Sequence, residues 1–403
     1  MAGARGHFAL LVALLVAIAV VPVSGCATDA GPGDDGATDN GEAATGEPYR
    51  IGAVLSLSGT LAGLGEPERN TILMEVERIN EAGGVNGRPI EVLIEDDASD
   101  AETAVAVTSR LIERENVVAL IGATGTGGTM AMRQEVDRAG LVQVSVAGGT
   151  VITADFHPYV FQTPWSNSIV VPFTLAYLQD QGISRIALIA DSGGFAKDGV
   201  DVMKDHLGDF DVEIVAEESF NPGDADMTSQ LTKIRATDAE AVVLWNAGAE
   251  AATVAKNMAA LNFDIPLFGS HGNARVEFIE GAGDAAEGFR FAAGKVLVPE
   301  AYGEGTPEYE VATDFIERYT ERFGKAPDTF AGHAYDALYL IVEAMQRLPE
   351  EFTSADLRDE IEATSGFVGI GGTFTFSPTD HNGMTEDNLV MYDIRDGEWI
   401  LAE

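Results

Sequence analysis

Two glycine-rich loops are the parts of this sequence best suited to binding a small anion. The first, residues 122–128, reads GATGTGG and lies between an apolar segment and a helical pattern. Thr and Gly at a helix N-terminus offer free backbone N–H groups, the positive end of the helix dipole and a hydroxyl. The second, residues 145–149, reads SVAGG and follows the next apolar segment. Such loops can hold a carboxylate without Lys or Arg, although the first alone is equally consistent with a tight turn.

The residues needed for common enzyme chemistry are missing or scattered. The first loop lacks the Gly-Lys-Ser/Thr of a nucleoside triphosphate site and the Gly-x-Gly-x-x-Gly of a dinucleotide site, and no Gly-x-Ser-x-Gly motif occurs. The six histidines form no His-x-His or His-Glu-x-x-His pair. One cysteine cannot build an internal disulfide, a zinc site or an iron–sulfur cluster. We therefore expect no enzyme, no metal and no other cofactor.

The charge balance excludes one class of partner and indicates an environment. The chain has 403 residues, 65 Asp and Glu against 24 Lys and Arg, and a formal net charge of −41. So acidic a chain will not bind nucleic acid through its phosphates. The acids are dispersed, which favours a salt-adapted surface over that of an ordinary acidic extracellular protein. The salt-adapted interpretation predicts that folded stability rises with salt up to molar levels.

The N-terminus has the pattern of a processing signal rather than of a folded element. Arg5 precedes an apolar run, Phe8 to Val21, and small residues then lead to the single cysteine, Cys26. This resembles a bacterial lipobox, and predicts a signal peptide over 1–25 and lipidation of Cys26. A plain secretory signal is the alternative, and a membrane-spanning anchor is disfavoured because the run is short. Residues 26–48, rich in Gly and acids, are expected to form a flexible tether.

From Tyr49 onward, segments typical of buried strands alternate with helical patterns. The expected strands are 51–55, 90–94, 117–121, 141–146, 186–190, 212–216, 241–245 and 266–269. The expected helices are 67–82, one following a capping box of Ser99 and Glu102, 129–139, 199–207, 227–236 and 249–261. This alternation indicates an α/β fold with two doubly wound parallel-sheet lobes. Both glycine loops then fall at the carboxyl edge of one sheet, where ligands bind.

Short motifs along the chain carry a family resemblance. In order, they are IGAVLSLSG at 51–59, GE at 65–66, INEAGGVNGR at 79–88, DDASD at 96–100, GAGDAAEG at 281–288, AYDAL at 334–338 and FTFSP at 374–378. Together they resemble type I periplasmic binding proteins, and among these the leucine/isoleucine/valine-binding proteins of ABC importers. The resemblance covers nearly all of residues 49–403. It implies two lobes joined by a three-strand hinge, an N-terminal lobe over 49–164 and 300–372, and a C-terminal lobe over 165–299 and 373–403.

The resemblance also implies which residues contact the ligand. Hydroxyl and main-chain groups that hold its carboxylate fall on Thr126, Ala147, Gly148 and Gly149. An aromatic residue of the C-terminal lobe falls on Phe195, and Asn246 is a further possible contact.

Two positions depart from the family pattern and bear on the ligand. Leu64 stands where amino-acid-binding members have an aromatic residue ahead of Gly65. His271 stands where they carry an acid that pairs with the ligand's ammonium, and a histidine cannot supply that negative charge. An aromatic or short aliphatic carboxylic acid therefore competes with an α-amino acid as the ligand.

These observations lead to one expected function and two rivals. The expected function is that of a lipid-anchored, monomeric binding protein on the outer face of the cytoplasmic membrane. It would capture a small carboxylate ligand, such as a branched-chain amino acid, and deliver it to an ABC-type permease. A tethered ligand sensor would use the same two-lobe trap. An extracytoplasmic enzyme is disfavoured because no set of nucleophile and base is evident.

Overall fold

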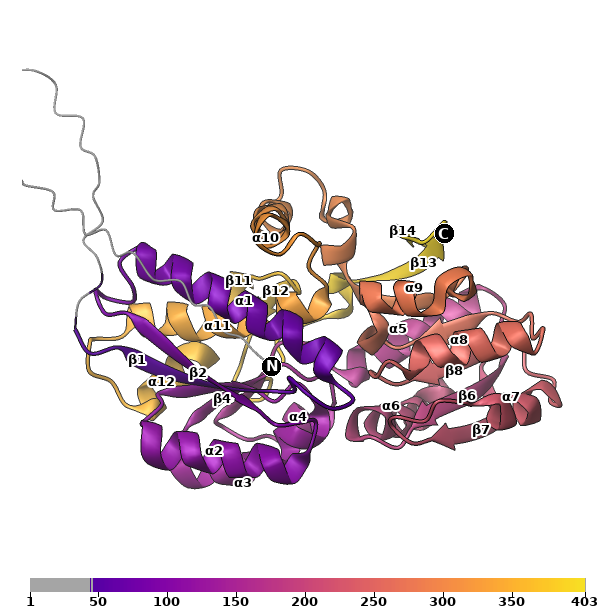
Figure 1. Cartoon of the computed structure of the whole chain (residues 1–403), viewed down its shortest axis with the longest axis horizontal. Helices are drawn as coiled ribbons and strands as arrows, with labels where there is room; N and C mark the ends of the chain where they lie inside the picture. The colour runs from indigo at the N-terminus through magenta and orange to yellow at the C-terminus, as the bar shows by residue number, and fades with distance from the viewer. Residues whose placement is uncertain (1–43, 45, 403) are drawn as a thin grey trace, which may run out of the picture. The chain divides into compact units, whose positions relative to one another are not determined.

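The computed structural model describes residue 44 and residues 46–402, and two larger sheets organise this part of the chain (Figure 1). The first is entirely parallel, in the order β2-β1-β3-β4-β5. Its strands are β1 (Tyr49–Leu55), β2 (Ile90–Asp96), β3 (Ala119–Gly122), β4 (Val142–Ser145) and β5 (Val160–Gln162). The two strands that lead into the glycine-rich loops, β3 and β4, are buried throughout, as expected for strands covered on both faces.

Helices cover both faces of this first sheet. They are α1 (Ala62–Glu81), α2 (Ala101–Glu115), α3 (Thr126–Ala139), α4 (Val151–Ala154), α11 (Thr329–Arg347) and α12 (Ser354–Glu362). In Figure 1, α1 and α11 lie on one side of the sheet, and α2 and α3 lie on the other. Ile72, Val76 and Ile79 of α1 are buried, as their helical spacing predicts.

The second sheet is mixed, in the order β14-β13-β10-β9-β8-β6-β7. Its strands are β6 (Arg185–Asp191), β7 (Glu213–Phe220), β8 (Ala241–Trp245), β9 (Leu267–Gly269), β10 (Arg290–Gly294), β13 (Leu389–Arg395) and β14 (Glu398–Leu401). The last two strands run antiparallel, so this sheet is not wholly parallel as expected. Strand β13 pairs antiparallel with β10, and it forms a hairpin with β14 through the turn Asp396-Gly397, in which both residues have positive φ.

The remaining elements accompany the second sheet or pack near helices α1 and α11. They are α5 (Asn167–Asp180), α6 (Gly194–His206), α7 (Thr228–Arg235), α8 (Glu250–Ala260), α9 (Val276–Ala282), α10 (Pro307–Phe323), and the two-stranded pair β11 (Ser365–Val368) and β12 (Thr373–Thr375). No helix in the described residues is long and apolar enough to cross a membrane.

Four predicted helix starts were wrong. Helices α1 and α6 begin at Ala62 and Gly194, before the predicted starts at 67 and 199. Helix α3 begins at Thr126 rather than at 129, so Gly127 and Gly128 form its first turn despite the low helix propensity of glycine. Helix α2 is capped by Asp100, whose side chain accepts a hydrogen bond from the Thr103 N–H, and not by Ser99. The Ser99 hydroxyl instead accepts from Leu61 N and donates to the Ser58 carbonyl, so it joins two loops.

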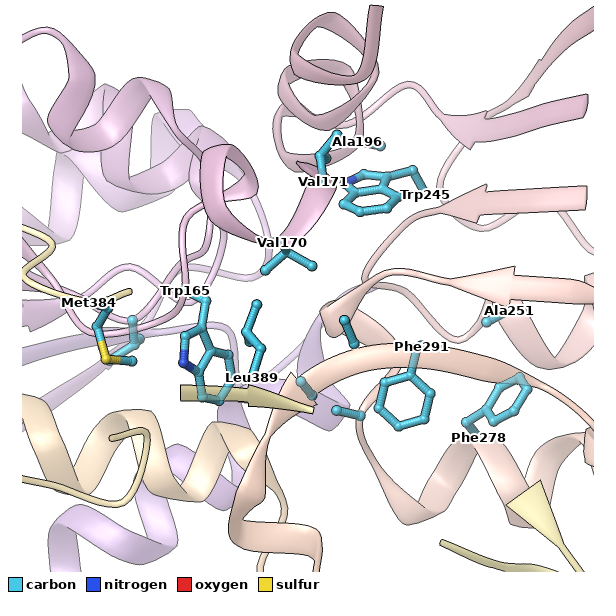
Figure 2. Packing of buried hydrophobic residues seen from close by; sticks show 14 of the residues in the cluster. Trp165, Val170, Val171, Ala196, Trp245, Ala251, Phe278, Phe291, Met384 and Leu389 are labelled. Carbon is cyan, nitrogen blue, oxygen red and sulfur yellow. The ribbon is translucent and has the colours of Figure 1, made fainter. Parts of the chain in front are cut away.

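Trp165 lies where the chain passes between the elements of the two sheets. Figure 2 shows its indole beside Met384, Val170 and Leu389. The indole is fully buried, and a Cβ added to Gly294 would lie 2.0 Å from its ring. Glycine at this position therefore lets β10 end directly against the indole.

Residues that precede β13 along the chain contact the first sheet. Gln162 N donates to His381 O, and the imidazole of His381 stacks on Phe161 at 4.0 Å. Residues just before Met384 therefore pack against β5 of the first sheet. The lobe limits given above remain predictions.

Candidate functional site

One cavity of about 190 Å³ lies where strands of both sheets end. From the first sheet it is lined by residues that follow β1, β2, β3 and β4, and from the second by residues that follow β6, β8 and β9. The carboxyl ends of parallel strands are the usual ligand-binding edge of α/β sheets, because loops and helix N-termini converge there. This cavity is therefore the candidate ligand site.

The N-terminus of α3 opens onto this cavity. Its N-cap is Gly125, and no side chain caps it. Thr126, the first helical residue, lines the cavity and is 3% exposed, and its hydroxyl has no hydrogen-bond partner among the described residues. A buried hydroxyl without a partner is costly, so its position beside uncapped N–H groups favours an anionic oxygen of a ligand there.

The second glycine loop holds its shape through contacts with neighbouring side chains. Gln162 Nε2 donates to the carbonyl oxygens of Ala147 and Gly149, at 2.9 and 3.3 Å. Ala147 and Gly148 line the cavity, whereas Gly149 does not. A Cβ on Gly149 would lie 2.4 Å from the Thr126 Cγ2, so a larger residue at position 149 would displace the Thr126 side chain.

Residues of the second sheet approach these loops closely. A Cβ on Gly148 would lie 2.5 Å from the His271 Nε2, and one on Gly194 would lie 3.2 Å from the Gly127 N. The N-terminus of α6 therefore meets that of α3 with only glycine backbone between them. Side chains at these positions would hold the two sets of loops apart.

His271 lines the cavity as an uncharged ring. It is 5% exposed, and neither ring nitrogen has a hydrogen-bond partner among the described residues. Burial lowers the pKa of His271 to about 3, and the nearby Trp165 carbonyl opposes this only in part. Its ring meets the Phe195 ring edge to face, with centroids 5.0 Å apart. His333, also on the cavity wall, has its pKa lowered to about 3 by burial.

Carboxyl groups are the charged side chains of the cavity wall. Asp97, Asp100, Asp191 and Glu250 line it, and none of the described lining residues is Lys or Arg. Asp97 is 2% exposed, and its Oδ1 accepts a hydrogen bond from the Ser56 hydroxyl at 2.6 Å. Burial raises the pKa of Asp97 and raises that of Asp191 to about 6. The wall is therefore acidic and apolar, with its positive potential confined to helix N-termini.

The structure brings together six of the eight positions expected to contact the ligand. Thr126, Ala147, Gly148, Leu64, Phe195 and His271 line the cavity. Gly149 does not line the cavity and lies against the Thr126 side chain. Asn246 lies outside the wall, where its side chain accepts from Asn273 Nδ2 at 3.0 Å and donates to Gly248 O at 3.3 Å. The role of all eight in binding stays a prediction. Cys26 lies outside the described residues.

Sequence reasoning missed the acids of the wall. Asp97, Asp191 and Glu250 are not distinguished in the sequence from the many other acids of the chain. A usable signal was present for two of them, because Asp97 directly follows β2 and Asp191 ends β6. The described residues contain no group of three or more His, Cys, Asp or Glu side chains placed to hold a metal ion.

The chain is similar to known proteins over most of its length. Residues 48–398 match the family model described as periplasmic binding protein. The Leu/Ile/Val-binding protein homolog 3 of Brucella melitensis is 23% identical over 82% of this chain and 87% of that protein. The leucine-, isoleucine-, valine-, threonine-, and alanine-binding protein of Pseudomonas aeruginosa is 23% identical over 80% of this chain and 86% of its own length.

Solved structures share the fold. An extracellular ligand-binding receptor from Rhodopseudomonas palustris HaA2 has a TM-score of 0.83 at 25% identity, over 89% of this chain and 100% of that one. The branched-chain amino acid transporter substrate binding protein LivJ of Streptococcus pneumoniae, in complex with isoleucine, has a TM-score of 0.78 at 24% identity, over 88% and 100% of the two chains. The chain thus belongs to the type I periplasmic binding proteins, a family of solute-binding proteins and not of enzymes, and it is similar to Leu/Ile/Val-binding members.

Proposed function

We propose that this protein captures a small carboxylate-bearing solute, a branched-chain or related amino acid, and delivers it to an ABC-type permease. One observation carries the proposal. The buried, unpartnered hydroxyl of Thr126 lies at the uncapped N-terminus of α3, inside a cavity formed by loops of both sheets. A carboxylate there would accept from the hydroxyl and from main-chain N–H groups.

The size and walls of the cavity support a small ligand with an apolar part. Leu64, Phe195 and Phe330 contribute apolar surface to a volume of about 190 Å³. The names of the Brucella and Pseudomonas relatives specify leucine, isoleucine and valine, which fit this description. Neither relative exceeds 23% identity, so the ligand of this chain has to be measured directly.

Delivery would depend on closure of the two lobes around the ligand. Gly194 and Gly127 bring α6 and α3 into contact across the cavity. Ligand contacts that exist only in this arrangement would shift the population toward it, and the permease would recognise the closed form. Lipidation of Cys26 would keep the protein at the outer face of the membrane, which mass spectrometry of protein extracted from membranes would test.

A thermal-shift panel in high salt tests the proposed ligand class. The panel contains branched-chain and other amino acids, short aliphatic acids and aromatic acids. A ligand present at about 100 times its Kd stabilises the folded state by about 2.7 kcal/mol, which is easily seen as a rise in Tm. We expect branched-chain amino acids to raise the Tm. If no carboxylate compound in the panel does so, the proposal is wrong.

A further inference from the structure

The walls of the cavity carry carboxyl groups from both sheets, Asp97 and Asp100 beside the first and Asp191 and Glu250 beside the second. On the side of the first sheet, α3 presents its N-terminus and the Thr126 hydroxyl. On the side of the second sheet, Asp191 ends β6 and Glu250 begins α8, just after β8. Strands β6 and β8 are hydrogen-bonded neighbours, so these two acids lie in adjacent loops at one sheet edge.

The two carboxyl groups have backbone partners but no cationic one in the cavity. Asp191 Oδ1 accepts from the Gly193 N–H at 2.6 Å, and Glu250 Oε1 accepts from the Gly223 N–H at 2.6 Å. The buried Arg275 lies close enough for the charge of Glu250 to act on it, but it forms none of the ion pairs found in the described chain. Burial raises the pKa of Asp191 to about 6, and the charge of Glu250 contributes to this rise, so the two acids repel each other.

Two acids at one cavity wall that form no ion pair there are stabilised by a cation that brings its own charge. Each carboxylate can accept more hydrogen bonds than the backbone supplies, because it has about four lone-pair positions. His271, 5% exposed and without a hydrogen-bond partner, lines the same cavity and can accept one further N–H at an unprotonated ring nitrogen. These acceptors suit an ammonium group, which has three N–H donors.

We propose that Asp191 and Glu250 bind the ammonium group of the ligand, so that the site selects α-amino acids over carboxylic acids that lack an amine. The inference rests on the proposed function, since it assumes that the ligand's carboxylate is held at α3. The negative charge that relatives of this kind were expected to place at position 271 is supplied here from the loops after β6 and β8. The carboxylate of one zwitterion then faces the N-terminus of α3, and its ammonium faces Asp191 and Glu250.

Matched ligand pairs test this selection. Calorimetric titration would compare alanine with propanoate, leucine with 4-methylpentanoate, and phenylalanine with 3-phenylpropanoate. We expect at least one amino acid to bind the wild-type protein at least about tenfold more tightly than its partner acid, the effect of about one charge-assisted hydrogen bond. If the partner acids bind as tightly as the amino acids or more tightly, the inference is wrong although the proposed function stands. If no member of any pair binds, the proposed function itself is contradicted, and this inference with it.

The variant Glu250→Gln tests whether Glu250 causes the selectivity for amino acids over acids that lack an amine. Its amide oxygen can still accept from the Gly223 N–H, so the loop keeps its contact while the charge is lost. We expect amino-acid affinity to fall about tenfold and affinity for the partner acid to hold or rise. Asp191→Asn provides a second variant with the same expectation. Glu280→Gln, at an exposed position of α9 outside the cavity, removes the same charge and should change neither affinity. Equal losses for both ligands of a pair would indicate a structural role and overturn the assignment.

Discussion

Helices α3 and α4 begin at the same edge of the first sheet, but the free N–H groups at their N-termini differ in their hydrogen-bond partners. At α4, the N–H groups of Thr150 and Val151 donate to the carboxylate of Asp198, at 2.7 and 3.1 Å. Asp198 belongs to α6, on the other side of the cavity, and also accepts from Asn167 Nδ2 at 2.8 Å. At α3, no side chain caps the helix, and the Thr126 hydroxyl has no partner among the described residues.

We interpret the N-terminus of α4 as a structural carboxylate site and that of α3 as the proposed ligand site. Both use backbone N–H groups and no base, which suits a chain with so few Lys and Arg. The protein fills the α4 site with its own Asp198, which is 7% exposed, and this contact joins elements of the two sheets. The α3 site has the same chemistry without a protein carboxylate. We infer that changes at Asp198 act on stability and changes at Thr126 act on ligand affinity.

The largest effect is expected for Asp198→Ala. The substitution removes the acceptor of three donors, one buried and two part-buried, so the free energy of unfolding should fall by about 2–3 kcal/mol. Chemical denaturation would measure it. Asp201→Ala, on the same helix, is the control, because Asp201 is exposed and pairs with the exposed Lys197. It should change stability by no more than about 0.5 kcal/mol. Equal losses of stability in the two variants would contradict a structural role of Asp198.

Thr126→Val should affect binding and leave folding nearly unchanged. The valine keeps the shape but loses the hydroxyl, which weakens ligand binding by about 1–3 kcal/mol because a hydrogen bond to a charged group is lost. Calorimetric titration with the tightest ligand of the panel would measure it. The unliganded protein should keep its stability to within about 0.5 kcal/mol, because the hydroxyl has no protein partner to lose. Unchanged affinity would exclude Thr126 from the site.

The smallest effect is a change in pH dependence at His271. Its pKa is about 3 in the folded protein and about 6.5 when unfolded, so the unfolded chain alone gains this proton as the pH falls below 6.5. Between pH 6.5 and 5.5, His271 should therefore cost the wild-type protein about 1 kcal/mol of stability that a His271→Gln variant keeps. Denaturation curves of both proteins at the two pH values would measure the difference. Identical slopes would mean that His271 is not held neutral.

The sequence predicted most strands because their apolar runs are short and bounded by turn residues. Strand β8 has the predicted limits of 241–245, and both glycine loops lie at the cavity as their positions after β3 and β4 implied. The start of helix α3 was predicted too late because glycine normally opposes helix formation. Here Gly127 and Gly128 allow close approach of other elements. Side-chain placement was harder to predict. Asp97 and Glu250 resemble many surface acids in this chain, and only the packing of loops from distant segments buries them.

A crystal structure of the protein with the tightest ligand of the panel would test the central claim most directly. The account predicts one ligand molecule in the cavity, with a carboxylate oxygen within about 3 Å of the Thr126 Oγ1 and facing the N-terminus of α3. A carboxylate bound elsewhere, with the Thr126 hydroxyl still without a partner, would contradict it.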